Sequence, residues 1–234
     1  MTLVLSTLAP FARGGNRLCF VHPHDPDRVV KVRRPDFTLA DVRRKKGFPR
    51  NLRPLSSFDD NREEYAVMQD IDRRLGEPVY ALVSRCYGFE DTDMGRGLVS
   101  ELIRDGDGRI SRTLKQHIWD DGYGEALQAA VRRFGEAWVA LAVPSRDLLV
   151  HNLVVQCSAG GEVQRLVAID GLGSTGMLPD RLRPRALRVA RAARKIANLH
   201  ARIDTLLAAR ARNEFPGTHG LLMHDGRVPP AGQP

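Results

Sequence analysis

Cysteine, aromatic side chains and long apolar runs are all scarce in this chain of 234 residues. The three cysteines, Cys19, Cys86 and Cys157, are odd in number and far apart, so they offer neither a disulfide framework nor a zinc-binding pattern. We therefore expect a reducing, cytoplasmic location. No run approaches about 18 uninterrupted apolar residues, so no transmembrane helix is predicted. The start of the chain also lacks the basic region and cleavage pattern of a signal peptide.

The chain has enough apolar residues for a packed core and a surplus of basic ones. Its hydrophobic content of 42% excludes an intrinsically disordered chain. The 36 Lys and Arg residues exceed the 28 Asp and Glu residues by 8. Residues 28–53 hold ten basic and two acidic side chains and residues 181–212 hold ten and one, so the rest of the chain is slightly acidic. The charge therefore predicts two basic patches rather than one general polyanion-binding surface.

The first half of the chain favours strands around one helix. A β-branched segment follows two apolar runs that flank a turn at Gly14 and Gly15, which predicts three antiparallel strands. Residues 33–57 are basic and contain proline, and we expect a solvated insertion or a short helix with a loop. Asp60 and Glu63 suit the N-cap and third position of a helix. The expected elements are strands at residues 4–11, 18–21, 28–32, 79–89 and 97–103 and a helix at residues 59–75.

The second half is predicted to be mainly helical. A turn-rich linker at residues 104–108 separates it from the first half. Ser111 can cap its first, short helix, and Pro184 suits the first turn of its last, basic helix. The C-terminal residues 213–234, including His219, are expected to be a solvated, disordered tail. The expected elements are helices at residues 111–119, 125–143 and 184–212 and strands at residues 148–155 and 163–169.

A buried ion pair is predicted between the third strand and the helix that follows it. Lys31 lies inside an apolar strand, where a charged side chain needs a partner or a function. In the helix, Met68 and Ile71 mark the buried stripe, and a step of four back from Met68 reaches Glu64. Glu63 instead falls on a mostly solvated row. The sequence therefore predicts a Lys31–Glu64 pair, which in phosphoryl-transfer enzymes places the lysine on nucleotide phosphates.

Three further patterns suit phosphoryl-transfer chemistry. Asp147 precedes Asn152 by five residues, between a long helix and a strand, which matches the spacing of a kinase catalytic loop. The aspartate would accept a hydroxyl proton, and the asparagine would offer a carbonyl oxygen to Mg²⁺. Asp170 ends a strand just before a glycine and would give the cation a carboxylate. The glycine pair in the first turn would let backbone amides approach phosphate, although a hairpin turn alone also explains it.

The order of these patterns predicts an ATP- and Mg²⁺-dependent phosphotransferase. A glycine turn, a strand lysine, a helix glutamate, a linker, an Asp–Asn loop and a strand-end Asp-Gly follow one another as in a kinase-like enzyme. The backbone after the fifth strand would offer hydrogen bonds to adenine. The candidate catalytic residues are Lys31, Glu64 and Asp147, the candidate metal ligands are Asn152 and Asp170, and the candidate nucleotide contacts are Gly14, Gly15, Lys31, Glu101 and Ile103.

At these residues the chain also resembles a known bacterial family, the YrbL proteins, which are named for the PhoP regulatory network. The resemblance spans roughly residues 8–205 apart from the insertion. It implies a protein-kinase-like fold, phosphate positioning by Lys31 and orientation of that lysine by Glu64. It likewise implies a catalytic Asp147 and metal binding by Asn152 and Asp170. The matching segments are Gly14-Gly15-Asn16-Arg17-Leu18-Cys19-Phe20-Val21-His22-Pro23, the strand that ends at Lys31, Glu64-Tyr65 and Asp170-Gly171-Leu172-Gly173.

The predicted fold is therefore α+β and two-lobed. A small antiparallel-sheet lobe with one key helix would occupy residues 1–103, with the basic insertion at residues 33–57. A reduced helical lobe with the catalytic loop and metal site would occupy residues 104–212, before the tail at residues 213–234.

Several features depart from typical protein kinases. Ser145 stands where their catalytic loop has histidine, and Gly171 follows Asp170 where they have Phe-Gly. The glycine turn is not G-x-G-x-x-G, and no Ala-Pro-Glu anchor follows Asp170. These departures favour a small-molecule or atypical kinase over a regulated Ser/Thr/Tyr protein kinase.

Two alternative functions stay open at this point. A pseudokinase would keep the fold as a regulatory binding module, although the retained Asp147, Asn152 and Asp170 favour activity. A basic nucleic-acid-binding module is the third hypothesis, but no zinc finger, RNA-binding signature or interleaved aromatic residues support it. The basic terminal helix would be a solvated face or would dock an acidic partner, an anionic lipid surface or a phosphorylated acceptor. The sequence names neither the acceptor nor the oligomeric state.

Overall fold

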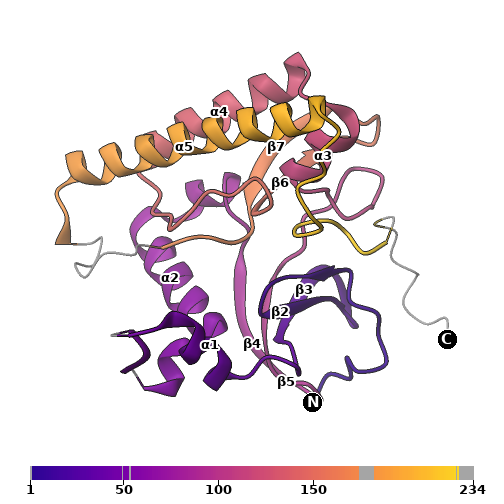
Figure 1. The fold of residues 1–234 in the computed structure, drawn as a ribbon, viewed down its shortest axis with the longest axis vertical. Helices are drawn as coiled ribbons and strands as arrows, with labels where there is room; N and C mark the ends of the chain where they lie inside the picture. Colours follow the sequence, from indigo (N-terminus) through magenta and orange to yellow (C-terminus); the bar gives the residue numbers. More distant parts are fainter. Residues whose placement is uncertain (1, 49, 53, 174–181, 225, 227–234) are drawn as a thin grey trace.

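The computed structural model describes residues 2–48, 50–52, 54–173, 182–224 and 226. Over this part of the chain the fold is α+β, as the sequence predicts. Figure 1 shows an antiparallel sheet at one end of the molecule and the longest helices at the other. The sheet has five strands in the order β1-β2-β3-β5-β4, which are β1 (Ala12–Arg13), β2 (Arg17–His22), β3 (Asp25–Arg33), β5 (Gly95–Glu101) and β4 (Cys86–Thr92).

The two faces of this sheet have different partners, because side chains alternate along each strand. Cys19 of β2 pairs with Lys31 of β3, so Arg17, Cys19 and Lys31 share one face of the sheet. The opposite face packs against the N-terminal segment. That buried cluster comprises Leu3, Leu5, Phe20, Val30, Val32 and Val99. The first face is therefore the one that carries the predicted functional lysine.

The N-terminal segment is not the strand that we expected at residues 4–11. Leu3 makes a bridge to Thr92, while the amide of Leu5 donates to Oδ1 of Asp93 at 2.8 Å. The amide of Ser6 donates to Oδ2 of the same aspartate at 3.2 Å. A side chain thus accepts the hydrogen bonds that a neighbouring strand would otherwise accept, and no ladder forms there.

The segment that separates Lys31 from Glu64 contains the predicted short helix with loops. The helix α2 that follows it is confirmed, but its N-cap is Asp59 rather than the predicted Asp60. The Asp59 carboxylate accepts a hydrogen bond from the Asn61 amide at 3.1 Å, which satisfies one of the free amides at the start of the helix. The elements are α1 (Leu39–Lys46), η1 (Arg50–Leu52), η2 (Leu55–Phe58) and α2 (Asp60–Leu75).

The fourth strand is shorter than the one predicted at residues 79–89. The first part of that segment belongs to the 3₁₀ helix η3 (Glu77–Ala81), and β4 begins only at Cys86. Gly76 precedes η3 with a φ of 61°, and Pro78 lies in its first turn. These two residues start a helical turn, which the apolar pattern alone did not indicate.

The remaining elements form a mainly helical part around a two-stranded sheet. Helices α4 and α5 lie side by side (Figure 1), and α3 packs on α5. A single buried cluster joins Met68 of α2, Trp138 of α4 and Leu199 of α5. Among the described residues no helix is long and apolar enough to cross a membrane. The elements are α3 (Leu114–Asp121), α4 (Glu125–Leu141), β6 (Leu153–Cys157), β7 (Val163–Ala168) and α5 (Arg185–Ala211).

Three predicted boundaries in this part were wrong. Thr113, not Ser111, caps α3, and its hydroxyl accepts from the Gln116 amide at 3.1 Å. Pro184 is the N-cap of α5 rather than a residue of its first turn. The strand predicted at residues 148–155 begins only at β6, because the preceding residues form a tight turn.

Residues 213–224 do not form the disordered tail that the sequence predicts. After α5 the chain turns back toward the sheet (Figure 1). Lys115, which is 4% exposed, donates from Nζ to the Gly217 carbonyl at 2.6 Å. Met223 donates its amide to the carbonyl of Phe11 at 2.8 Å, beside the first hairpin. We call residues 214–224 the C-terminal strap. Most of the remaining predicted tail lies outside the described residues.

Candidate functional site

A buried ion pair joins β3 to α2, as the sequence predicts. Lys31 Nζ lies 2.7 Å from Oε1 of Glu64, and the two side chains are 7% and 10% exposed. The second carboxylate oxygen of Glu64 pairs with Arg17 from β2. Burial disfavours the charged lysine, but the charges of Glu64 and Asp170 together favour it, and the pKa of Lys31 is raised. The α2 stripe that buries Met68 and Ile71 brings Glu64 to the strand lysine.

Arg17 also reaches Asp170, the predicted strand-end carboxylate. Its Nη2 atom lies 2.6 Å from Oδ2 of Asp170, while Oδ1 accepts a hydrogen bond from the Gly171 amide at 2.6 Å. Burial alone would raise the pKa of Asp170, but Arg17 and then Lys31 outweigh it and lower that pKa to about 2. Lys31 Nζ further donates to the Ile169 carbonyl at 3.0 Å. Asp170 is therefore ionised at any physiological pH.

Gly171 shows how closely the two predicted loops approach each other. Its φ is 79°, and a Cβ at this position would overlap the carbonyl oxygen of Asp147 and lie 2.8 Å from Nδ2 of Asn152. The Gly171 carbonyl accepts hydrogen bonds from the amides of Arg146 and Asp147 at 2.8 and 3.2 Å. Only glycine combines this backbone conformation with such close contact. The structure thus brings the Asp147–Asn152 loop against the strand end at Asp170.

The Asp147 carboxylate is held by α5. Nη2 of Arg202 lies 2.9 Å from its Oδ1 and 3.1 Å from its Oδ2, and Nζ of Lys195 lies 3.9 Å from Oδ1. Lys195 also donates to the carbonyl of Arg146. The sequence placed the basic residues of this helix on a solvated or docking face and did not connect them with Asp147.

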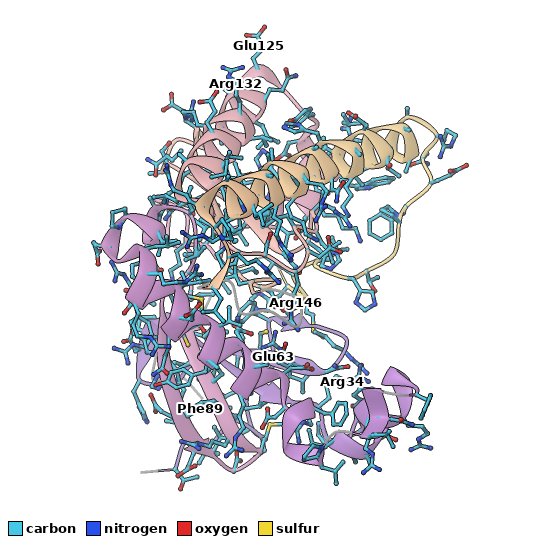
Figure 2. The ribbon with its side chains drawn as sticks, turned by 90° about the vertical axis from the view of Figure 1, so that its left-hand side faces the viewer. Arg34, Glu63, Phe89, Glu125, Arg132 and Arg146 are labelled. Carbon is cyan, nitrogen blue, oxygen red and sulfur yellow. The ribbon has the colours of Figure 1, made fainter. Side chains whose placement is uncertain are left out.

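Arg146, next to Asp147, connects the same loop to α2. Its Nη1 lies 2.9 Å from Oε1 of Glu63. Figure 2 labels both residues where α2 meets the helical part. Glu63 remains half-exposed, as its predicted place on a solvated row implies. In α2, Glu64 therefore holds Lys31, and the preceding Glu63 holds the Asp147 loop through Arg146.

A cavity of about 230 Å³ lies between the sheet and the helical part. Cys19 and Val29 line it from the sheet, and Val154 lines it from β6. Glu64 and Asp147 do not line it, since Glu64 pairs with Lys31 at its margin and Asp147 lies against Gly171. The predicted residues that do line this cavity are Gly14, Gly15, Lys31, Glu101, Ile103, Asn152 and Asp170.

The backbone after β5 borders the apolar end of the cavity. Leu102 and Ile103 are buried there, and the Ile103 carbonyl accepts from the Ser111 amide at 3.0 Å. The Ile103 amide donates to no backbone carbonyl within the described part of the chain. The Glu101 amide, by contrast, donates to the Arg85 carbonyl at 2.8 Å.

Sequence reasoning missed two components of this site. Arg17 was not singled out, because alternation in β2 puts it on one face with Cys19, and only the register with β3 shows that this is the face of Lys31. The C-terminal strap was also missed, yet His219 and Leu222 line the cavity, and Leu222 packs against the cluster around Val29. Its glycine- and proline-containing sequence carries no periodic signal that would have indicated this position.

Asp170 and Asn152 are the residues that could hold a cation beside the cavity. A carboxylate and a side-chain amide oxygen are hard donors of the kind that Mg²⁺ prefers. In the ranges that the structure describes, no three His, Cys, Asp or Glu side chains are grouped so that they could hold a metal ion. This donor pair therefore fits a cation that takes its remaining ligands from a substrate phosphate and water.

Fold and site together define an α+β protein with a buried Lys–Glu pair beside a cavity. The family model of the PhoP regulatory network protein YrbL matches residues 3–204, so the chain belongs to this family, which confirms the resemblance seen in the sequence. The chain is 25% identical over 185 residues to "Uncharacterized protein YrbL" of Escherichia coli (strain K12), with 75% of each protein covered. The protein of the same description from Shigella flexneri matches with the same identity and coverage.

A solved structure, that of Rad53 1-466 in complex with AMP-PNP, matches 88% of this chain with a TM-score of 0.46 and 14% sequence identity. The chain spans about half of that protein, with 52% of its length covered.

Proposed function

We propose that this chain is an ATP- and Mg²⁺-dependent phosphotransferase with a two-lobed, kinase-like fold. The observation that carries the proposal is the Lys31–Glu64 pair at the margin of a cavity that Asp170 and Asn152 also line. In phosphoryl-transfer enzymes of this kind a strand lysine held by a helix glutamate contacts nucleotide phosphates, while an Asp and an Asn bind metal. A buried ion pair is weak evidence for stability but good evidence for a site.

The apolar end of the cavity suits an adenine ring. Val29, Leu102 and Val154 offer apolar surface from both sides. The carbonyl of Glu101 and the amide of Ile103 would hydrogen-bond the edge of the base, and the lack of a backbone partner for the Ile103 amide among the described residues supports this role.

The polar end of the cavity suits phosphates and a cation. A Cβ on Gly15 would meet open space, so packing does not explain this glycine, and close approach of a phosphate to the turn would. Lys31 would contact the phosphates, oriented by Glu64. Asp170 and Asn152 would hold Mg²⁺, which neutralises charge on the phosphate oxygens when bound. Arg17 would have to leave Oδ2 of Asp170 before that oxygen could become a ligand.

Asp147 would orient the hydroxyl of the acceptor and accept its proton. The acceptor class follows from the sequence beyond Asp170, which has no Ala-Pro-Glu anchor. We therefore infer a small-molecule or atypical kinase rather than a regulated Ser/Thr/Tyr protein kinase.

Formation of ADP tests this proposal. The purified chain is incubated with ATP and Mg²⁺ with water as acceptor, and ADP is quantified. We expect slow turnover that Asp170→Ala abolishes and that Asp147→Asn lowers about a hundredfold, the typical contribution of a general base. Asp204→Asn, which changes an exposed carboxylate of α5, is the matched control and should keep native turnover. Equal turnover in the native chain and Asp170→Ala would contradict the proposal.

A second candidate function is a pseudokinase that binds nucleotide without transferring phosphate. Two ion pairs favour it, because Arg17 holds Asp170 and Arg202 holds Asp147, the carboxylates that catalysis would need. Stabilisation of the chain by ATP and Mg²⁺ without any ADP formation would support this function over the first.

A further inference from the structure

One row of α5 presents a series of cations to the Asp147 loop. Arg188, Lys195 and Arg202 recur every seven residues, about two helical turns, so they lie on the same face of the helix. Lys195 and Arg202 contact Asp147, and Arg188 lies beside Ser145 at the start of the same loop. The row therefore follows the loop that would hold the phosphoryl acceptor.

Two donors of this row and one hydroxyl of the facing loop lack a hydrogen-bond partner within the described part of the chain. Nη1 of Arg202, Nε of Arg188 and Oγ of Ser145 are buried side-chain atoms without a partner among the described residues. Nearly all buried polar groups in proteins are hydrogen-bonded, so three such atoms beside one loop are informative. Ser145, Arg188 and Lys195 also line a common cavity of about 10 Å³, the size of a single water. Nη1 of Arg202 does not line this cavity, and an acceptor oxygen of a ligand beside Asp147 would satisfy it where the described residues do not.

Among the residues that the structure describes, the charge around Asp147 is not balanced. In the described part of the chain, Asp147 is the carboxylate that contacts Lys195 and Arg202. The adjacent Arg146 is already paired with Glu63. Two cations of α5 thus hold one carboxylate, so among the described residues positive charge remains where a substrate would approach. Arginine in particular suits the planar or tetrahedral oxygens of carboxylates and phosphates.

We propose that Lys195 and Arg202 form an anion-binding subsite for the phosphoryl acceptor, which is a small hydroxyl compound that carries a phosphate group. The assignment of an acceptor rests on the proposed phosphotransferase function. A phosphate offers more acceptor oxygens and more negative charge than a carboxylate, which suits two neighbouring cations, of which Arg202 has an unsatisfied donor among the described residues.

The subsite also supplies a way to couple acceptor binding to chemistry. When the phosphate group binds Arg202, this arginine exchanges Asp147 for the ligand. Asp147 is then free to accept the proton of the acceptor hydroxyl as its oxygen bonds to the γ-phosphorus of ATP. The bond between that phosphorus and the bridging oxygen breaks, and ADP leaves with the bond's electron pair.

Calorimetric titration with glycerol 3-phosphate tests the subsite, with glycerol as the uncharged probe. We expect saturable binding of glycerol 3-phosphate and none of glycerol. Arg202→Met and Lys195→Met should each weaken the binding about tenfold or more, the loss of one charge-assisted contact. Arg188→Met, two helical turns from Lys195, should weaken the binding less and leaves Asp147 with both of its cations. Arg194→Met removes an exposed charge from another face of α5 and is the matched control.

Two outcomes would overturn the subsite. One is the absence of saturable binding to the native chain, and the other is equal weakening in Arg194→Met, which would indicate unspecific attraction to the helix. Because the nucleotide end of the cavity also carries cations, the titration is repeated in Lys31→Met, where the subsite predicts unchanged binding.

A parallel titration with ATP and Mg²⁺ separates the two proposals. Binding of glycerol 3-phosphate without binding of ATP would leave the subsite standing and contradict the phosphotransferase. Binding of ATP without binding of glycerol 3-phosphate would contradict the subsite alone.

Discussion

The guanidinium of Arg17 lies 2.6 Å from the carboxylate of Asp170, although 153 residues separate them in the sequence. The same guanidinium pairs with Glu64, so one arginine of β2 joins the helix carboxylate to the strand-end carboxylate. In the proposed function, Arg17 therefore competes with the metal ion for the carboxylate of Asp170. Nucleotide and Mg²⁺ would have to displace Arg17 from Asp170, so any activity would depend on this arginine.

The first prediction concerns the buried pair of Lys31 and Glu64. Glu64→Gln leaves the cations of Lys31 and Arg17 buried without their shared carboxylate, and we expect a loss of about 3–5 kcal/mol in the free energy of unfolding. Lys31→Met should cost less, because Arg17 still neutralises Glu64. Urea unfolding of the three proteins measures both changes. A smaller loss in Glu64→Gln than in Lys31→Met would contradict this reading of the cluster.

The second prediction concerns Gly171. Gly171→Ala must place a Cβ against the Asp147 carbonyl in a left-handed conformation, so it should destabilise the chain by several kcal/mol. Gly161→Ala is the matched control, because Gly161 has a φ of 83° but open space around its Cβ position, and it should cost only about 1–2 kcal/mol. Unfolding of the two variants is compared by calorimetry. Equal losses would mean that the Asp147 loop does not press on Gly171.

The third prediction concerns the C-terminal strap. A Cβ on Gly220 would overlap the side chain of His151, whereas Gly217, with a similar φ, has open space around it. Gly220→Ala should therefore lift the strap from the cavity and raise amide hydrogen exchange throughout residues 214–224, while Gly217→Ala should not. If ATP binds as proposed, Gly220→Ala should also weaken it, since strap residues line the cavity. Unchanged amide hydrogen exchange in Gly220→Ala would contradict the packing of the strap against His151.

The fourth prediction concerns the pH dependence of stability. Burial lowers the pKa values of His117 and His151 from the ordinary value of 6.5. Below that value the unfolded chain takes up protons before the folded chain does, so the free energy of unfolding falls as pH drops from 7.5 to 5.5. His117→Gln and His151→Gln should each reduce this fall. His200→Gln, at an exposed position of α5, should leave it unchanged.

Much of the candidate site could be predicted because local rules place its residues. The four-residue step from Met68 put Glu64 on the inner stripe of α2, and the strand pattern around Lys31 gave it a matching partner. The loop of Asp147 and Asn152 and the strand end at Asp170 were recognised by spacing and order. Their mutual approach follows from the fold, and contact with Gly171 completes it.

The components that escaped prediction depend on contacts distant in sequence. Arg17 lies 47 residues from Glu64, and no local pattern connects them. The strap is held largely by backbone carbonyls that accept from Lys115, so its own side chains carry little signal. In the same way, the caps of α2 and α3 were displaced by one or two residues, because neighbouring polar residues compete to be the cap and only geometry selects one.

The most direct test of the central claim is the stabilisation of the chain by ATP with and without Mg²⁺. A ligand at about one hundred times its dissociation constant raises the free energy of unfolding by about 2.7 kcal/mol. We predict a stabilisation of this size that requires Mg²⁺ in the native chain and in the control Asp204→Asn, and that is lost in Asp170→Ala. No Mg²⁺-dependent stabilisation, or an equal one in Asp170→Ala, would contradict the account.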